Sequence, residues 1–323
     1  MKQVAKTRLK TIKVNNQSAR VIEDCYKEYL EHCKSIGQRS ATLTSKEKFY
    51  RYELLKRLKP DDKISVINKK TVEGWINKLI DDGYKGGTYQ TFVIKLKAFL
   101  TYCFTREYLE EFEVKIPNII LTKKEIYTEA ELKKLLKRPD LNTCVAGDYR
   151  SYVTVLFLMA TGCRSTTLLN IRVRDLDFNK ESMLFAHMKT YRQVIAPMTT
   201  TLKVELQEYI NIFNLQADDI LFPKLDGTQM SYDTLHQNLV NYFKHCKVKM
   251  RGVNTFRNTF ATMFIKNGGD IYRLKLLLNH SNIKTTERYV NLLPLEFKED
   301  LLKYNPLETL QAKNKRSRVR LRK

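Results

Sequence analysis

The 323-residue sequence lacks the cysteine patterns of a metal site or a disulfide framework. Its six cysteines include no CxxC pair, the spacing that many zinc sites and dithiol motifs share. They are expected to be ordinary reduced thiols in a cytosolic protein. The sequence therefore predicts no zinc site, no other metal and no cofactor.

Long apolar runs are also missing. No run approaches the roughly 18 consecutive apolar residues that a membrane-spanning helix needs. The chain starts with MKQVAKTR, which lacks the apolar core of a signal peptide. We therefore expect a cytoplasmic protein with no membrane partner.

Acidic residues are scarce relative to basic ones. The chain has 58 Lys and Arg against 35 Asp and Glu, a formal net charge of +23, while 43% of its residues are hydrophobic. A core of ordinary size is therefore expected, together with more positive charge than solubility requires. Residues 1–120 carry +9 (24 basic, 15 acidic), which leaves +14 on the rest. This excess, spread along the chain, favours a polyanionic partner over a membrane surface.

A break in the helical pattern divides the chain. Residues 20–112 have apolar residues at helical spacing, and the proline-containing segment 113–125 is predicted to be a linker. Residues 126–311 form a second expected domain. The basic N-terminal arm, 1–19, has five Lys or Arg and no acid in its first 13 residues; the basic tail, 312–323, has seven and no acid. The arm fits a solvated segment and a phosphate-binding one equally well.

The first domain is predicted to be a bundle of four short helices. The second helix is expected to begin at Ser40 or Thr42 and to run to Leu58, where a Pro-Asp-Asp sequence ends it. Thr71 is the expected N-cap of the third helix, and the fourth opens at two glycines. Such a bundle offers helical surfaces on which basic side chains can line up.

Three lysines of this bundle are candidate contacts to a polyanion backbone. Lys85 precedes the fourth helix, and Lys95 and Lys97 lie within it. Taken singly, each fits a solvated surface lysine better.

The second domain combines helices with a small three-stranded antiparallel sheet. The capping-box pattern from Thr128 to Glu131 starts its first helix. Alternating patterning predicts strands at 176–178, 182–188 and 193–198. Helices are predicted at 200–213, 231–247, 254–267, 270–278, 283–292 and 295–303. The fold class is therefore mainly α, with a helical N-terminal domain and a mixed α/β C-terminal domain.

Five residues of the second domain have the chemistry needed to move a phosphodiester without a metal: Arg164, Lys189, Arg257, His280 and Tyr289. An arginine fork binds two phosphate oxygens at once and keeps its charge. A tyrosine hydroxyl can attack and later leave, because a phenol is a tolerable leaving group. The leaving oxygen also needs an acid. Singly, ion-pair arginines, a solvated lysine and a core tyrosine would explain these residues too.

The order and spacing of the motifs resemble the tyrosine recombinases, the lambda-integrase or phage integrase family. The family motifs appear as Thr161-Gly-Cys-Arg164, the hairpin lysine Lys189, Asn254-Thr-Phe-Arg257 and Leu278-Asn-His280 followed by Thr285-Thr-Glu-Arg-Tyr289. The 23-residue step from Arg257 to His280 and the nine-residue step to Tyr289 also fit. Residues 126–303 carry these motifs, and residues 20–112 look like the family's core-binding domain.

Three positions depart from the family pattern. Asn254 replaces the usual histidine, so a neutral amide stands where an acid, base or phosphate contact is expected. Thr167, three residues after Arg164, replaces a common acid that would orient the arginine. Asn279 replaces the glycine before His280. We expect slower or differently tuned chemistry from these changes, and no loss of it.

The resemblance implies a role for each site residue. Tyr289 would attack the scissile phosphate, form a 3′-phosphotyrosine and free a 5′-hydroxyl. Arg164 and Arg257 would stabilise the phosphorane, His280 would bind a non-bridging oxygen or accept the tyrosyl proton, Lys189 would protonate the leaving oxygen, and Asn254 would make a weaker contact. Arg288, beside the nucleophile, is a further candidate phosphate contact, although a surface position fits it better.

The resemblance also implies partners. They are double-stranded DNA with inverted-repeat core sites and three further copies of the chain, in a tetramer on two DNA sites. Neither metal nor ATP is implied, and the location is the nucleoid of a prokaryotic cell or its mobile element. The apolar stretch 295–304 fits two arrangements equally: a helix packed on its own domain, or one donated to a neighbouring subunit.

Two other functions remain open at this stage. One is a type IB topoisomerase-like enzyme that nicks and closes DNA. The other is a DNA-binding regulator of the same fold with weakened cleavage, which the residues at Asn254 and Thr167 would favour. Integration or excision of a mobile element is the biological role that we expect of the recombinase.

Overall fold

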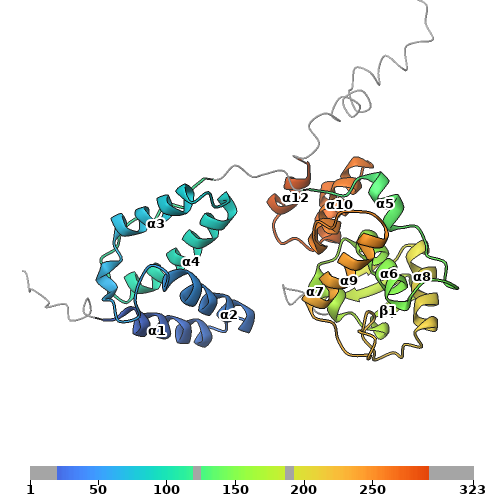
Figure 1. Cartoon of the computed structure of the whole chain (residues 1–323), viewed down its shortest axis with the longest axis horizontal. Coiled ribbons are helices and arrows are strands. Elements are labelled where there is room, and N and C mark those ends of the chain that lie inside the picture. Colours follow the sequence, from blue (N-terminus) through green and yellow to red (C-terminus); the bar gives the residue numbers. More distant parts are fainter. Residues whose placement is uncertain (1–19, 119–124, 186–192, 291–323) are drawn as a thin grey trace, which may run out of the picture. The chain divides into compact units, whose positions relative to one another are not determined.

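The computed structural model describes residues 20–118, 125–185 and 193–290, without the side chains of Arg288 and Val290. The chain divides into two compact units, Met1–Thr122 and Lys123–Lys323 (Figure 1). Helices dominate both, as predicted, and the second contains the three-stranded sheet. Within the described ranges, no helix is long and apolar enough to cross a bilayer.

The first unit is a helical bundle, as predicted. Its helices are α1 (Ile22–Ser35), α2 (Ser40–Phe49), a π-helical turn (Tyr50–Leu54), a short 3-10 turn (Ile64–Val66), α3 (Lys69–Asp81) and α4 (Gly86–Thr105). The apolar α4 contacts α1, α2 and α3 and carries the fully buried Phe99. Tyr26 of α1 packs against it with ring centroids 4.8 Å apart. Val114, within the expected linker, also packs into this core.

Two local predictions in this unit were wrong. Thr71 is not the N-cap of α3: Asn68 is, and its side chain accepts a hydrogen bond of 3.0 Å from the Thr71 backbone N–H. Asparagine caps at least as well as threonine, so the helix starts a turn earlier. The predicted second helix to Leu58 ends as an α-helix at Phe49 and continues only as the π-helical turn.

The second unit surrounds one buried helix, α6 (Ala146–Thr161). Its other elements are α5 (Glu129–Leu135), α7 (Ser165–Asn170), β1 (Leu176–Asp177), β2 (Ser182–Phe185), β3 (Val194–Pro197), α8 (Thr200–Ile212), α9 (Tyr232–His245), α10 (Val253–Lys266), α11 (Ile271–Leu277) and α12 (Lys284–Val290). The helix α6 is apolar on most of its circumference and contacts α8, α9 and α10. The antiparallel sheet has the order β1-β2-β3 and pairs Phe185 with Val194. β1 and β3 are each shorter than predicted by one or two residues, β2 begins at Ser182 as predicted, and the rest of its predicted span, 186–188, lies outside the described residues.

The segment that opens the second unit is fixed to α10. The Tyr127 ring is 1% exposed and lies 4.9 Å from the Phe256 ring, and its backbone N–H donates to Thr259 Oγ1 over 3.0 Å. Arg251 completes the attachment, since its backbone N–H donates to Tyr127 Oη and its guanidinium donates to Glu131 over 2.8 Å. The chain entering this unit is therefore attached to the helix that carries Arg257.

Replacing Glu131 should lower the stability of the second unit in a pH-dependent way. Glu131→Gln removes a charge-assisted hydrogen bond, which typically contributes about 1–3 kcal/mol. The bond from Arg251 holds the pKa of Glu131 below its usual value. The carboxylate therefore stabilises the fold fully above its unfolded pKa of about 4.3, and this contribution is lost as pH falls through the lower folded pKa.

The measurement is thermal unfolding of the full chain at several pH values. The midpoint of Glu131→Gln should lie below that of the wild type at pH 7 and approach it below about pH 4. Glu129→Gln, at an exposed position of the same helical turn, is the control and should change the midpoint little. Equal shifts for both variants would contradict the prediction.

Candidate active site

A glycine turn places Arg164 at the end of the buried helix α6. Gly162 ends that helix with φ 58°, a left-handed conformation, and Arg164 is the N-cap of α7. A side chain at Gly162 would put its Cβ 2.3 Å from the Phe260 ring. The Thr-Gly-x-Arg motif thus has a structural cause: only glycine allows the turn and the close contact with α10.

Arg257 connects three segments that are far apart in sequence. Its Nη1 donates to Gly162 O over 2.9 Å, and its Nη2 donates to Leu278 O over 2.7 Å and to His280 Nε2 over 2.8 Å. The residue is only 7% exposed. The Arg164 turn, the His280 loop and α10 therefore meet at one guanidinium.

The electrostatics of this guanidinium fit an anion. Burial and, after it, the positive charge of Arg164 together lower the pKa of Arg257 to about 10. The group still carries its charge at neutral pH. Neither arginine forms an ion pair with a carboxylate of the described residues. Two neighbouring positive charges without a carboxylate counterion are a site for an anionic ligand.

His280 is held in one orientation by two contacts. Because a guanidinium only donates, His280 Nε2 accepts from Arg257, and the proton of the neutral ring lies on Nδ1. Thr286 Oγ1, fully buried, lies 2.8 Å from Nδ1 and accepts that proton's hydrogen bond. His280 does not cap the following helix α12; there, Asn282 Oδ1 accepts a hydrogen bond of 2.9 Å from the Lys284 backbone N–H.

Tyr289 packs against these groups from α12. It is 3% exposed, within a small apolar cluster with Ala261, Leu274 and Leu278. Its ring is stacked on His280, with centroids 6.3 Å apart and planes 14° from parallel. Its hydroxyl lies 3.5 Å from Asn258 Oδ1, on the helix of Arg257. The predicted nucleophile therefore lies with both arginines and the histidine at one place.

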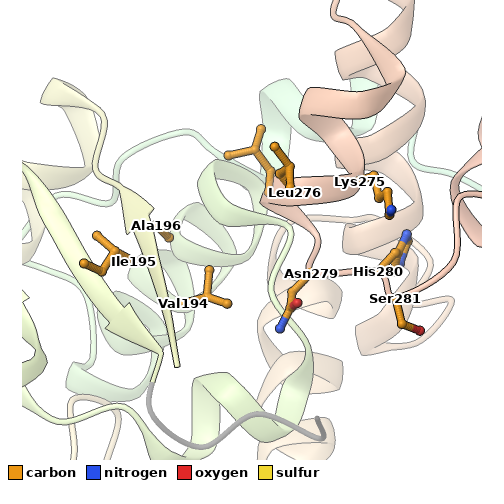
Figure 2. A pocket seen from close by; sticks show the side chains of 9 residues that line it. Val194, Ile195, Ala196, Lys275, Leu276, Asn279, His280 and Ser281 are labelled. Atoms are coloured by element: carbon orange, nitrogen blue, oxygen red, sulfur yellow. The ribbon is translucent and has the colours of Figure 1, made fainter. Parts of the chain in front are cut away.

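An open pocket of about 650 Å³ adjoins His280. Figure 2 shows its two sides: Val194 and Ile195 of β3 on one, and Leu276, Asn279 and His280 on the other. Lys189 lies outside the described residues. The strands that bracket its segment, however, pair at Phe185 and Val194, and Val194 lines the same pocket as His280. The hairpin therefore starts beside the site.

The model of the phage integrase family matches residues 125–296. The chain belongs to the phage integrase family. This confirms the resemblance to tyrosine recombinases that the four motifs predicted.

Several tyrosine recombinases are similar in sequence. Tyrosine recombinase XerD of Pseudomonas putida is 25% identical over 221 residues, 66% of this chain and 73% of that protein. Tyrosine recombinase XerD of Staphylococcus haemolyticus is 23% identical over 276 residues, 79% of this chain and 89% of that protein. The second match extends beyond the motif-bearing domain.

Solved integrase structures share the fold. A lambda integrase dimer bound to a COC′ core site has a TM-score of 0.69 at 14% identity and covers 88% of this chain and 81% of its own. The Tn1549 transposon integrase in complex with circular intermediate DNA has a TM-score of 0.66 at 18% identity and covers 82% and 94%. At such identities the likeness concerns the fold alone.

The positions that depart from the family pattern have distinct surroundings in this integrase. Asn254 is exposed at the start of α10, and Thr167 is buried within α7 at 4% exposure. Asn279 has φ 47°, the left-handed conformation that glycine favours and that asparagine tolerates better than most residues. The family glycine can therefore be replaced here without a change of backbone.

One residue at the site was missed by sequence reasoning. Asn258 follows Arg257 directly and contacts the Tyr289 hydroxyl. It lies one helical turn after Asn254, on the same face of α10, which is the signal that could have indicated it. Thr286 was noticed in the motif, but its bond to His280 was not foreseen.

The three candidate lysines of the first unit do not share one direction. Lys95 Nζ donates to Ser45 of α2 over 3.0 Å, whereas Lys97 Nζ donates to the Val114 carbonyl over 3.2 Å. Lys85 is exposed at the start of α4. The side chain of Arg288 lies outside the described part.

Among the described residues, no group of three or more His, Cys, Asp or Glu is placed to hold a metal.

Gly162→Ala should destabilise the second unit by roughly 2 kcal/mol or more, because the new Cβ meets the Phe260 ring and the backbone is left-handed. Gly147→Ala is the matched control: it lies in the first turn of α6 with nothing within 4 Å of its Cβ and should be neutral or slightly stabilising. Denaturant unfolding compares the two. An equal free energy of unfolding for both variants would refute this account of the turn.

Asn279 offers a test of the left-handed position before His280. Asn279→Gly should leave the midpoint of thermal unfolding nearly unchanged, since glycine adopts this backbone without strain. Asn279→Val should lose about 1–2 kcal/mol, because a β-branched residue is strained there. A valine variant as stable as the glycine variant would show that the backbone is not constrained at this residue.

Proposed function

We propose that this chain is a site-specific DNA recombinase that cleaves and rejoins DNA through a 3′-phosphotyrosine. The carrying observation is the pair Arg164 and Arg257, without a carboxylate partner in the described part of the chain, beside His280 and Tyr289. Such a pair of arginines is best suited to bind a phosphodiester in its transition state, where negative charge builds up on the non-bridging oxygens. The net charge of +23 supports DNA as its source.

In this reaction the Tyr289 oxygen attacks the scissile phosphorus and the bond to the 5′-oxygen breaks. Arg164 and Arg257 neutralise the charge on the non-bridging oxygens, and His280 bonds one of them or takes the tyrosyl proton. Lys189 gives a proton to the leaving 5′-oxygen, and Asn254, exposed at the start of α10, adds a neutral contact. Attack by a 5′-hydroxyl of another strand then restores the tyrosine and joins the strands.

The Arg257 contacts indicate how DNA would change the site. Its bonds to Gly162 O and Leu278 O keep the guanidinium in place from two sides. The bond to His280 Nε2 joins two groups that both have a role toward phosphate. A phosphate oxygen could replace this mutual contact and accept from each side chain, with the histidine then protonated. The site would thus be assembled before DNA binds.

The assembly that fits this function is a tetramer on two DNA duplexes with inverted-repeat core sites. Its support is the shared fold, since one structure with that fold is a lambda integrase tetramer bound to a Holliday junction, with a TM-score of 0.67 at 15% identity. The helical first unit would bind DNA, with Lys85, Lys95 and Lys97 as candidate contacts. Arg288 of the second unit, the basic arm 1–19 and the tail 312–323 would add further contacts. The role would be integration or excision of a mobile element.

The deciding experiment uses a nicked suicide substrate with the core site, taken from inverted repeats that flank the gene. The wild type should give a protein–DNA adduct that survives SDS, and Tyr289→Phe should give none, because the nucleophilic oxygen is gone. Tyr272→Phe is the matched control, at a tyrosine that is 67% exposed, and should form adduct like the wild type.

Each other outcome identifies an alternative. An adduct with Tyr289→Phe would show that another residue is the nucleophile. DNA binding without any adduct would point to a regulator of this fold. Plasmid relaxation that does not depend on the site would favour a topoisomerase-like enzyme.

A further inference from the structure

Asn258 is a polar residue outside the four motifs that contacts the proposed nucleophile. It lies on α10 directly after Arg257 and is half-buried. Its Oδ1 atom lies 3.5 Å from Tyr289 Oη, and α10 and α12 are in contact along this region. Neither the Asn-Thr-Phe-Arg motif nor the family pattern assigns a role to this position.

The side-chain amide of Asn258 can direct the Tyr289 hydroxyl without taking its proton. The carboxamide oxygen accepts a hydrogen bond, and the group neither gains nor loses a proton near neutral pH. Asn258 therefore orients the Tyr289 O–H and leaves its proton for the base of the reaction. A carboxylate at this position would instead compete with phosphate for the neighbouring Arg257 guanidinium.

The length of the contact agrees with a temporary role. Two oxygens 3.5 Å apart are at the outer limit of a hydrogen bond, so little free energy is lost when the hydroxyl moves away. The Tyr289 ring is guided from another side by its stacking on His280. The ring and the hydroxyl are thus contacted by different residues, and the loose contact of the hydroxyl with Asn258 breaks at little cost when attack begins.

We propose that Asn258 is a positioning residue for the nucleophile, which directs the Tyr289 hydroxyl beside Arg257 before DNA is attacked. The proposal rests on the proposed function, because it gives the hydroxyl its role as nucleophile. It differs from the role of Asn254, which is exposed one turn earlier and is expected to face phosphate.

The test compares three variants in single-turnover adduct formation at saturating DNA. Asn258→Leu keeps the volume and removes the acceptor, so the hydroxyl is no longer directed before attack, and the adduct rate should fall roughly threefold to tenfold with unchanged DNA affinity. Asn258→Gln keeps an amide oxygen within reach of this loose contact and should restore most of the rate. Asn267→Leu, at the exposed end of the same helix, is the control and should match the wild type.

A second measurement is independent of cleavage. A double-mutant cycle of thermal unfolding combines Asn258→Leu with Tyr289→Phe, which removes only the hydroxyl. If the two side chains interact, the effect of Asn258→Leu should be smaller in the Tyr289→Phe background than in the wild type. This readout holds even if one variant is inactive.

The outcomes separate the two proposals. A leucine variant that forms adduct as fast as the wild type, or a glutamine variant as slow as leucine, would overturn the role of Asn258. Additive effects in the cycle would overturn it as well. A wild type that forms no adduct would instead refute the recombinase, while the cycle would still decide whether Asn258 holds the hydroxyl.

Discussion

The hydrogen bonds of the Arg257 guanidinium are the interaction on which the site depends. They join α10 to the Gly162 turn and to the loop that holds the Leu278 carbonyl and His280, three separate parts of the chain. A buried charge is costly unless its donors are satisfied, so any displacement of one segment leaves a donor without an acceptor. The hydrogen bonds that satisfy the donors of Arg257 therefore also fix the positions of the other site residues relative to one another.

The uncompensated charge at this site has a functional meaning. A carboxylate beside Arg257 would lower the cost of burying it, yet within the described ranges none is paired with it or with Arg164. Burial and Arg164 instead lower the pKa of Arg257 to about 10. The fold thus holds two positive charges close together without a carboxylate counterion, and under the proposed function the scissile phosphate would supply the missing negative charge.

The support for α10 comes from the far side of the helix. Tyr127 packs on Phe256 and binds Thr259, and Arg251 ties the same segment to Glu131. The face of α10 with Phe256 belongs to the main core, whereas Arg257 and Asn258 meet α12. One helix therefore connects the main core to the candidate site, and the role proposed for Tyr289 as nucleophile would require such firm placement.

The sequence by itself determined the family, the mainly helical class and the motif residues, because Thr-Gly-x-Arg, the His280 to Tyr289 spacing and the alternating strands are local patterns. Only the tertiary structure decided what lies beside them. Asn258 meets Tyr289 through the contact of α10 with α12, and Lys95 and Lys97 take different directions that depend on packing. Asn279 takes a left-handed backbone at the end of α11, where its own N–H donates to Leu276 O and the His280 N–H donates to Lys275 O. Contacts between segments remote in sequence are set by how helices pack, and no local pattern encodes them.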